Sequence, residues 1–206
     1  VILSFSMGKD AIGALIQLRR FFKRVELFHL TQVPGIEFVE AELQRFENEL
    51  GQQIHRCISP SFFRMLRNNV FQPPDRLDFL DHLPMPVATH EDVDRWIRNK
   101  LGEHWIGLGV RETDSLARRM SIAMNGPWKV RRRNFFPIYD WRMDQLVAEI
   151  ANAKIRLPVD YEMFGRTFDG IDFHYLKPIK DRFPRDYETI KYWFPLVELE
   201  EIRREL

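Results

Sequence analysis

Short apolar runs and amphipathic stretches alternate along the first part of the chain. The apolar run at 1–3 is followed by small and polar residues, and then by apolar positions at helical spacing over 11–18. The alternation recurs with a run at 25–30, an amphipathic stretch at 36–50 and a further run at 53–58. Short apolar runs are typical of buried strands, and helical periodicity is typical of amphipathic helices. The order strand, helix, strand, helix, strand predicts a parallel sheet with right-handed crossovers.

The pattern becomes less regular after the third predicted strand. Prolines interrupt residues 59–91, which we expect to form an insertion or lid on the substrate side rather than a second domain. A helix is predicted over 91–101, a fourth strand over 104–110 and a further helix over 143–150. We therefore expect a doubly wound α/β fold with a parallel sheet of about five strands.

Aromatic residues and prolines are concentrated in the last part of the chain, residues 157–206. Aromatic stripes of this kind are more typical of a core or a dimer surface than of a platform that stacks nucleobases. We predict one domain over 1–156, carrying the insertion at about 59–91, with 157–206 as a helical, aromatic extension packed on the same domain. A homodimer is a further expectation.

Composition narrows the class of protein. The chain has 206 residues, 45% of them hydrophobic and 30% charged, as expected for a globular domain with a real core. The net charge of +1 gives no global attraction to nucleic acid or membrane. A single cysteine excludes an internal disulfide framework, and no apolar run is long enough to cross a bilayer. We expect a cytoplasmic protein, with a few residues trimmed before the first strand.

Candidate chemistry lies in the turn between the first strand and the first helix. Such a turn points backbone N–H groups and the positive end of a helix dipole at one spot, which suits phosphate or sulfate. Ser4 and Ser6 add hydroxyl donors, and Gly8 allows an anion to approach the backbone closely. Lys9 supplies a mobile positive charge, while Asp10 can cap the helix or help to hold a metal ion. The alternative is an ordinary strand-to-helix turn.

The turn is not a Walker loop, because Leu3 and Asp10 stand where that motif needs Gly and Ser or Thr. It resembles instead the PP-loop, Ser-x-Gly-Gly-x-Asp-Ser, of the adenine nucleotide α-hydrolases. It is most similar to Ser-Phe-Ser-Gly-Gly-Lys-Asp-Ser of the phosphoadenosine phosphosulfate (PAPS) reductase family. Met7 replaces the first Gly of that pattern, and Ala11 replaces its last Ser. The matching residues are Ser4, Phe5, Ser6, Gly8, Lys9 and Asp10. The resemblance implies a PP-loop (HUP-like) fold whose anion-binding loop includes Met7.

A second block, residues 109–119, resembles the family's Gly-x-Arg-x-x-(Glu/Asp)-Ser-x-x-Arg. A guanidinium at the end of a strand, here that of Arg111, can bind phosphate or sulfate oxygens in bidentate fashion. Arg118 and Arg119 follow about one turn later and are candidates for the same anion. The alternative is a solvated basic helix start, with an aspartate and an arginine paired four residues apart. The matching residues are Arg111, Asp114, Ser115 and Arg118, and the resemblance makes Ser115 a further candidate contact for the nucleotide.

Three further segments bear on the site. The run Gly35-Ile36-Glu37-Phe38 matches the Gly-x-Glu-Phe that family members carry after the second strand, and the resemblance places Gly35 beside the nucleotide. Residues 137–141 resemble the family's Pro-Ile-x-x-Trp segment, which we interpret as architectural. The basic run 129–133 is a candidate contact for nucleic acid or a protein partner, and the alternative is a solvated loop.

The residues that this sequence lacks also bear on its function. PAPS reductases use a cysteine near the C-terminus, and related enzymes hold an iron–sulfur cluster with paired cysteines. This chain has only Cys57, so we expect no such cluster. Cys57 is either a catalytic thiol at the end of the third predicted strand or a small buried apolar residue. The six histidines show no ligand spacing, so no structural zinc site is expected.

The resemblance implies an enzyme that binds ATP or PAPS with Mg²⁺. In the leading interpretation the loop holds the β- and γ-phosphates of ATP while a substrate attacks the α-phosphorus, which releases AMP and pyrophosphate. Lys9, Asp10 and Arg111 are the candidate catalytic residues for this adenylylation, and its substrate would enter sulfur or nitrogen chemistry, including chemistry on a nucleic acid. The alternatives are a PAPS or adenylylsulfate reductase that uses Cys57, and a non-catalytic module that binds a nucleotide or a partner.

Overall fold

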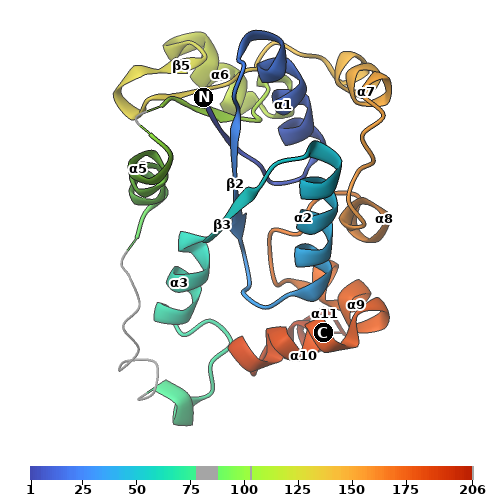
Figure 1. Ribbon diagram of the computed structural model, residues 1–206. Helices are drawn as coiled ribbons and strands as arrows, with labels where there is room; N and C mark the ends of the chain where they lie inside the picture. Colours follow the sequence, from blue (N-terminus) through green and yellow to red (C-terminus); the bar gives the residue numbers. More distant parts are fainter. Residues whose placement is uncertain (78–87, 103, 206) are drawn as a thin grey trace. The chain divides into compact units, whose positions relative to one another are not determined.

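The computed structural model describes residues 1–77, 88–102 and 104–205 (Figure 1). The middle of the predicted insertion, 78–87, lies outside the described residues. The chain divides into two compact units, which are described in turn. The first unit comprises Val1–Leu30, Gln52–Cys57 and Glu91–Pro158. The second unit comprises Thr31–Gly51, Ile58–His90 and Val159–Leu206.

The sheet runs through the first unit. Within the described residues six strands form it, in the order β3-β2-β1-β4-β6-β5. Their bounds are β1 (Ile2–Ser4), β2 (Glu26–Thr31), β3 (Ile54–Ile58), β4 (Ile106–Leu108), β5 (Trp128–Lys129) and β6 (Asn134–Phe135). Strand β1 pairs in parallel with β2 and β4, and β4 pairs in parallel with β6. The predicted α/β fold is confirmed, but the short antiparallel edge strand β5 lies in a stretch where no strand was predicted.

Helices cover both faces of these strands, which is why the strands read as continuous apolar runs. On one face, Ile97 of α5 (His90–Leu101) packs in a cluster with Ile2, Phe28, Cys57 and Ile106. On the other face, α1 (Lys9–Phe21) packs beside α7 (Met143–Asn152). Figure 1 shows α5 on one side of the strands, with α1 and α7 on the other. This arrangement makes the first unit doubly wound.

Three further helical elements belong to the first unit. They are η2 (Glu112–Asp114), α6 (Leu116–Asn125) and η3 (Val130–Arg132). The predicted helix at 143–150 corresponds to α7, and the predicted helix at 91–101 corresponds to α5.

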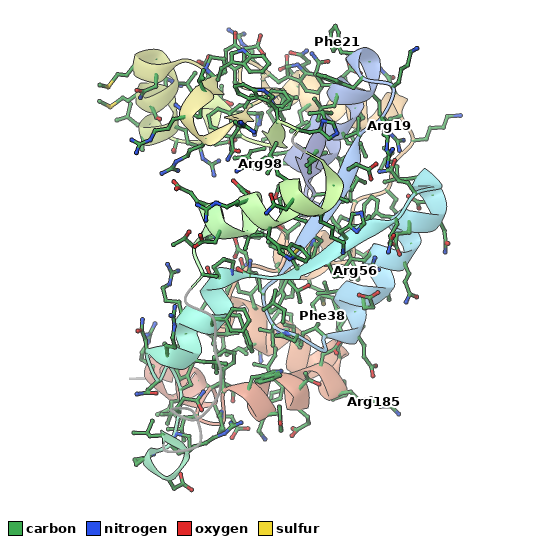
Figure 2. All side chains as sticks on the ribbon, turned by 60° about the vertical axis from the view of Figure 1, so that its left-hand side comes forward. Arg19, Phe21, Phe38, Arg56, Arg98 and Arg185 are labelled. Carbon is green, nitrogen blue, oxygen red and sulfur yellow. The ribbon has the colours of Figure 1, made fainter. Side chains whose placement is uncertain are left out.

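The second unit is helical and has an aromatic core. Its elements are α2 (Glu37–Leu50), α3 (Pro60–Arg67), η1 (Pro74–Arg76), α8 (Asp160–Phe164), α9 (Phe173–Arg182), α10 (Pro184–Trp193) and α11 (Leu199–Glu205). Phe38 stacks on Phe183 with ring centroids 5.1 Å apart and meets Phe168 edge-on. Figure 2 shows Phe38 among other side chains, while Arg185 projects from its helix. Among the described residues, no helix has the length and apolar character needed to cross a membrane.

A buried carboxylate holds the start of α2. The Asp186 side chain accepts hydrogen bonds from the backbone N–H of Glu37 at 2.6 Å and of Phe38 at 3.1 Å. Asp186 is only 2% exposed, and this burial raises the pKa of its carboxyl. The preceding Gly35 has a φ of +87°, a conformation that glycine adopts most easily. The Gly-x-Glu-Phe run therefore has a structural role as the turn and first residues of a helix capped from α10.

We predict that Asp186→Ala lowers the free energy of unfolding by about 2 kcal/mol, because two helix N–H groups lose a charged acceptor. Asp186→Asn keeps one acceptor oxygen and should lose less.

Since the folded-state pKa of Asp186 is raised, the folded protein binds a proton at this carboxyl more tightly than the unfolded chain does. Lowering the pH from 7 to 4 therefore stabilises wild type relative to Asp186→Asn, which has no carboxyl to protonate. The advantage of wild type over Asp186→Asn should be larger at pH 4 than at pH 7. Urea denaturation at both pH values measures this, and equal losses for the two variants would contradict the cap.

Candidate functional site

The loop between β1 and α1, residues 5–8, is anchored at its first residue and is called the Gly8 loop below. The backbone N–H of Phe5 donates to the carbonyl of Phe28 at 2.7 Å, and the Phe5 carbonyl lies 3.0 Å from Nδ1 of His29. Ser6 is exposed, and its hydroxyl accepts from the Gly8 N–H at 3.4 Å. Gly8 precedes the helix and has no side chain to cap it. The start of α1 thus remains available to an outside acceptor such as an anion.

Met7 adopts the conformation that suits glycine. Its φ is +64°, in the left-handed region, and the residue is 1% exposed. A non-glycine residue in this region costs about 1–2 kcal/mol, which burial of the side chain offsets here. The family pattern that the loop resembles has glycine at this position. The loop therefore keeps a glycine-like backbone turn although the residue has changed.

The two sequence blocks meet through Arg111. Its Nε donates to Oδ1 of Asp10 at 2.8 Å, and its Nη2 donates to Oδ1 of Asp114 at 2.6 Å. A third donor, Nη1, lies 3.3 Å from the hydroxyl of Thr113. Arg111 is 2% exposed, so its charge is buried but paired on two sides. Lys9 Nζ donates to the other oxygen of Asp10 at 2.7 Å, which places this carboxylate between two cations.

Close backbone contact accompanies these ion pairs. A Cβ atom placed on Gly109 would lie 2.7 Å from the carbonyl carbon and oxygen of Asp10 and 2.8 Å from the nitrogen of Ala11. All three are backbone atoms of the first turn of α1, so no side chain can move aside. Only glycine allows the end of β4 to approach the helix start this closely.

Asp114 is a second carboxylate, after Asp10, that accepts hydrogen bonds from more than one cationic residue. Its Oδ2 accepts from the backbone N–H of Arg111 at 3.1 Å and from Nη1 of Arg118 at 2.8 Å. The Ser115 hydroxyl caps α6 by accepting from the Arg118 N–H at 3.2 Å. The pair four residues apart that the sequence offered as an alternative is thus present, and Ser115 has a capping role. Arg119 is exposed.

The structure therefore joins a connected set, here named the Arg111 network: Lys9, Asp10, Arg111, Asp114 and Arg118. Three cations meet two carboxylates, so these five residues together carry one net positive charge. Ser4 ends β1 and is partly exposed. Gly35 belongs to the second unit, where it forms the turn before α2. The central position of Asp114 was not predicted, although its spacing of three and four residues from two arginines was visible in the sequence.

Magnesium would need acceptor oxygens that are not already engaged. Both oxygens of Asp10 accept from cations, and the described residues contain no group of three or more His, Cys, Asp or Glu side chains that could hold a metal ion. Mg²⁺ usually binds through one or two carboxylates together with substrate phosphates. Asp10, whose two oxygens are both engaged, is therefore not free to hold this ion in the arrangement described.

Cys57 lies in the apolar cluster under α5. It is 9% exposed and packs with Phe28 and Ile97 among others. Burial raises the pKa of its thiol to about 11. Because the thiolate is the nucleophilic form, this environment disfavours attack by Cys57 at neutral pH.

Comparison with known proteins supports the fold. No family model matches the chain, and no curated protein matches its sequence. Among solved structures, the phosphate complex of phosphoadenylyl-sulfate (PAPS) reductase from Candida auris is similar, with a TM-score of 0.51 and 16% sequence identity. The match covers 84% of this chain and 81% of that one. At this identity the likeness shows the fold alone, and the predicted PAPS reductase-like fold is confirmed.

We predict that Gly109→Ala lowers the free energy of unfolding by about 1–3 kcal/mol, because the new methyl group would press on the backbone of α1. Gly170→Ala is a suitable control, since a Cβ there would meet side-chain atoms rather than backbone, at 3.3 Å from the Tyr175 ring and 3.4 Å from the Asp172 side chain. Urea denaturation of both variants measures the difference. A smaller loss at Gly109 than at Gly170 would contradict the close approach.

We also predict that Cys57 reacts slowly with a thiol reagent at pH 8 in the folded protein. Raising its pKa from 9.0 to about 11 lowers the thiolate fraction at this pH about 100-fold, and burial limits access further. Labelling with DTNB should become fast after unfolding in urea, which provides the control within one sample. Fast stoichiometric labelling of the folded protein would show that the thiol is accessible and activated.

Proposed function

We propose that the Gly8 loop binds the phosphate tail of an adenine nucleotide. The observation that carries this proposal is the 2.8 Å ion pair between Arg111 and Asp10, which joins the two anion-motif segments at the start of α1. An uncapped helix start after a glycine, with net positive charge in the adjoining network, is the kind of environment that favours phosphate. The fold likeness to a PAPS reductase solved with phosphate supports the choice of ligand.

Lys9 and Arg111 would have different roles. The Lys9 side chain is 29% exposed and can turn from Asp10 to a phosphate oxygen. Arg111 is buried and holds Asp10 and Asp114, so we assign it as a positioning residue that fixes the loop against β4. Arg118 is half-exposed and lies where a second phosphate group could reach it.

We further propose that the bound nucleotide is ATP and that it is cleaved between the α- and β-phosphates. A substrate oxygen would form the new bond to the α-phosphorus, the bond to the bridging oxygen would break, and pyrophosphate would leave with the electron pair. Lys9 would neutralise charge on this leaving group in the loop. A reductase that uses Cys57 is less consistent with its buried, protonated thiol.

A second candidate is binding without turnover. Ala11 is buried and has no hydroxyl to offer in the first turn of α1. Asp10 also has both oxygens engaged by cations, which limits its use as a base or metal ligand. These observations favour a module that holds the nucleotide while another component acts on it.

Calorimetry tests the binding site. We predict that ATP or PAPS binds and that Lys9→Ala weakens binding roughly 10–100-fold, the loss expected for one charge-assisted hydrogen bond. Lys23→Ala, which removes an exposed lysine beyond the end of α1, is the matched control. No heat of binding with ATP, PAPS or sulfate would end the proposal.

The two candidates differ in products. Release of AMP and pyrophosphate from ATP, in the presence of trial acceptors, would establish cleavage. Tight binding with ATP recovered intact across these acceptors would favour the binding module.

A further inference from the structure

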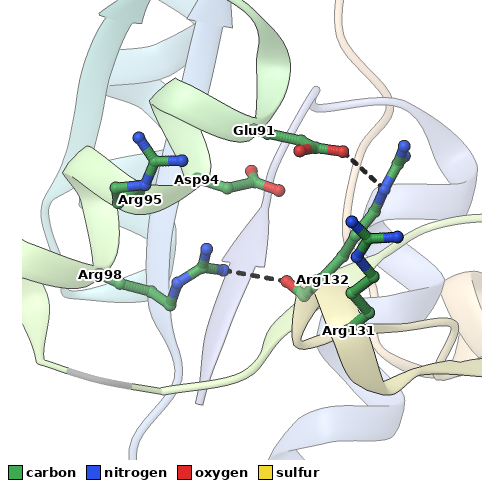
Figure 3. Close-up of a pocket in the computed structure, with 6 residues that line it drawn as sticks. All are labelled: Glu91, Asp94, Arg95, Arg98, Arg131 and Arg132. Carbon is green, nitrogen blue, oxygen red and sulfur yellow. Dashed lines mark hydrogen bonds and ion pairs between the residues drawn. The ribbon is translucent and has the colours of Figure 1, made fainter.

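A cationic cleft lies elsewhere in the first unit and is named the α5 cleft (Figure 3). It has a volume of about 400 Å³, within the range of small-ligand sites. Helix α5 contributes one wall and η3 contributes the other. Its lining residues are Glu91, Asp94, Arg95, Arg98, Arg131 and Arg132.

The α5 cleft is separate from the Gly8 loop. Element η3 leads into β6, and the carbonyl of Arg133 accepts from the N–H of Ile106, the first residue of β4. These residues therefore lie at the amino ends of the parallel strands. The Gly8 loop and Arg111 follow the last residues of β1 and β4, at the carboxyl ends. The two sites thus lie at opposite ends of the same strands.

Positive charge exceeds negative charge in the α5 cleft. Arg132 pairs with Glu91 at 2.7 Å, and Arg98 donates to the carbonyl of Arg132 at 3.3 Å rather than to a carboxylate. Figure 3 shows both contacts crossing between α5 and η3. Arg131 has no ion pair with the residues that the structure describes. A surface arginine is ordinarily neutralised by an ion pair with a carboxylate. The guanidinium groups of Arg98 and Arg131 instead retain N–H donors for an anion.

One carboxylate of the cleft is fixed in place. Asp94 accepts from Nδ2 of Asn134 at 2.9 Å, and Asn134 is 8% exposed. The Oδ1 atom of Asn134 is buried and has no partner among the described residues. A buried amide thus holds Asp94 beside the arginines, where it can accept a hydrogen bond from a ligand.

We infer that the α5 cleft binds a nucleotide unit, with its phosphate on Arg98 and Arg131 and an amino group of its base on Asp94. Guanidinium groups bind phosphate oxygens, and a carboxylate accepts from the exocyclic amine of cytosine. The unit can come from a free mononucleotide or from single-stranded nucleic acid, since both present the same groups. This inference does not depend on the proposed function of the Gly8 loop.

Fluorescence anisotropy with a labelled 12-nucleotide oligodeoxycytidylate tests the inference, and cytidine monophosphate serves as competitor. The double variant Arg98→Ala/Arg131→Ala should bind at least tenfold more weakly. Its slope of log affinity against log salt should be smaller by roughly 0.7, the change expected for the one phosphate that the variant no longer neutralises. The control is Lys177→Ala/Arg185→Ala, which removes two exposed charges from the second unit. Circular dichroism verifies that all variants fold.

The outcomes separate the sources of the ligand. Displacement of the oligonucleotide by the monophosphate at similar concentration identifies a free nucleotide, while resistance to displacement identifies a strand, and both support the inference. The wild type should prefer oligodeoxycytidylate over oligodeoxythymidylate, and Asp94→Ala, which removes the acceptor, should abolish this preference. An unchanged preference would overturn the role of Asp94. Absence of binding, or equal weakening in the control, would overturn the site. Loss of binding only in Lys9→Ala would assign the ligand to the Gly8 loop instead.

Discussion

The buried guanidinium of Arg111 is the constraint on which the first unit's candidate site depends. A charge removed from water must be paired on nearly every side, and here Asp10 and Asp114 supply the pairing. Asp10 lies 101 residues before Arg111 in the chain, so the contact fixes two distant segments in one geometry. Once that contact forms, the Gly8 loop, the start of α1 and the end of β4 can no longer vary independently. The glycine at 109 is a consequence of the same closeness.

Arginine has opposite uses in the two cationic regions of this unit. Arg111 is buried, and its three side-chain nitrogens donate to Asp10, Thr113 and Asp114, so its role is to hold other groups. In the α5 cleft the arginines are more exposed and are only partly neutralised. The same side chain therefore organises one site and offers charge in the other. Solvent exposure, rather than residue type, distinguishes the two roles.

Much of the first unit was predictable, because its signals are local in sequence. The apolar run before Ser4 and the helical spacing from Ala11 place a strand and a helix, and the block around Arg111 follows another strand. Parallel strands then bring both blocks to the carboxyl ends of the strands, where they lie close together. The role of Asp114 was not predicted, because a carboxylate near two arginines reads equally well as a surface pair. The sequence shows that Met7 replaces a glycine of the family pattern, but only the structure shows that its backbone keeps the left-handed conformation.

The second unit shows why other features escaped prediction. The resemblance places the Gly-x-Glu-Phe run beside a nucleotide, but it does not reveal that Asp186, 149 residues beyond Glu37, caps the helix that begins there. No local pattern reports a partner at that separation. Phe38 likewise belongs to an aromatic core assembled from helices near the end of the chain. Long-range packing of this kind is decided by burial and shape, which a single sequence displays only indirectly.

Strand β5 also affects how the protein behaves in a crowded solution. An open sheet edge is a template on which another molecule can add a strand, and proteins limit this with short edge strands and lysine. Here the edge strand has two residues, includes Lys129 and turns at once into an arginine-bearing helical turn. Like charges on approaching molecules would repel before backbone pairing could begin. The basic segment thereby protects this edge of the sheet from aggregation, whatever ligand it meets.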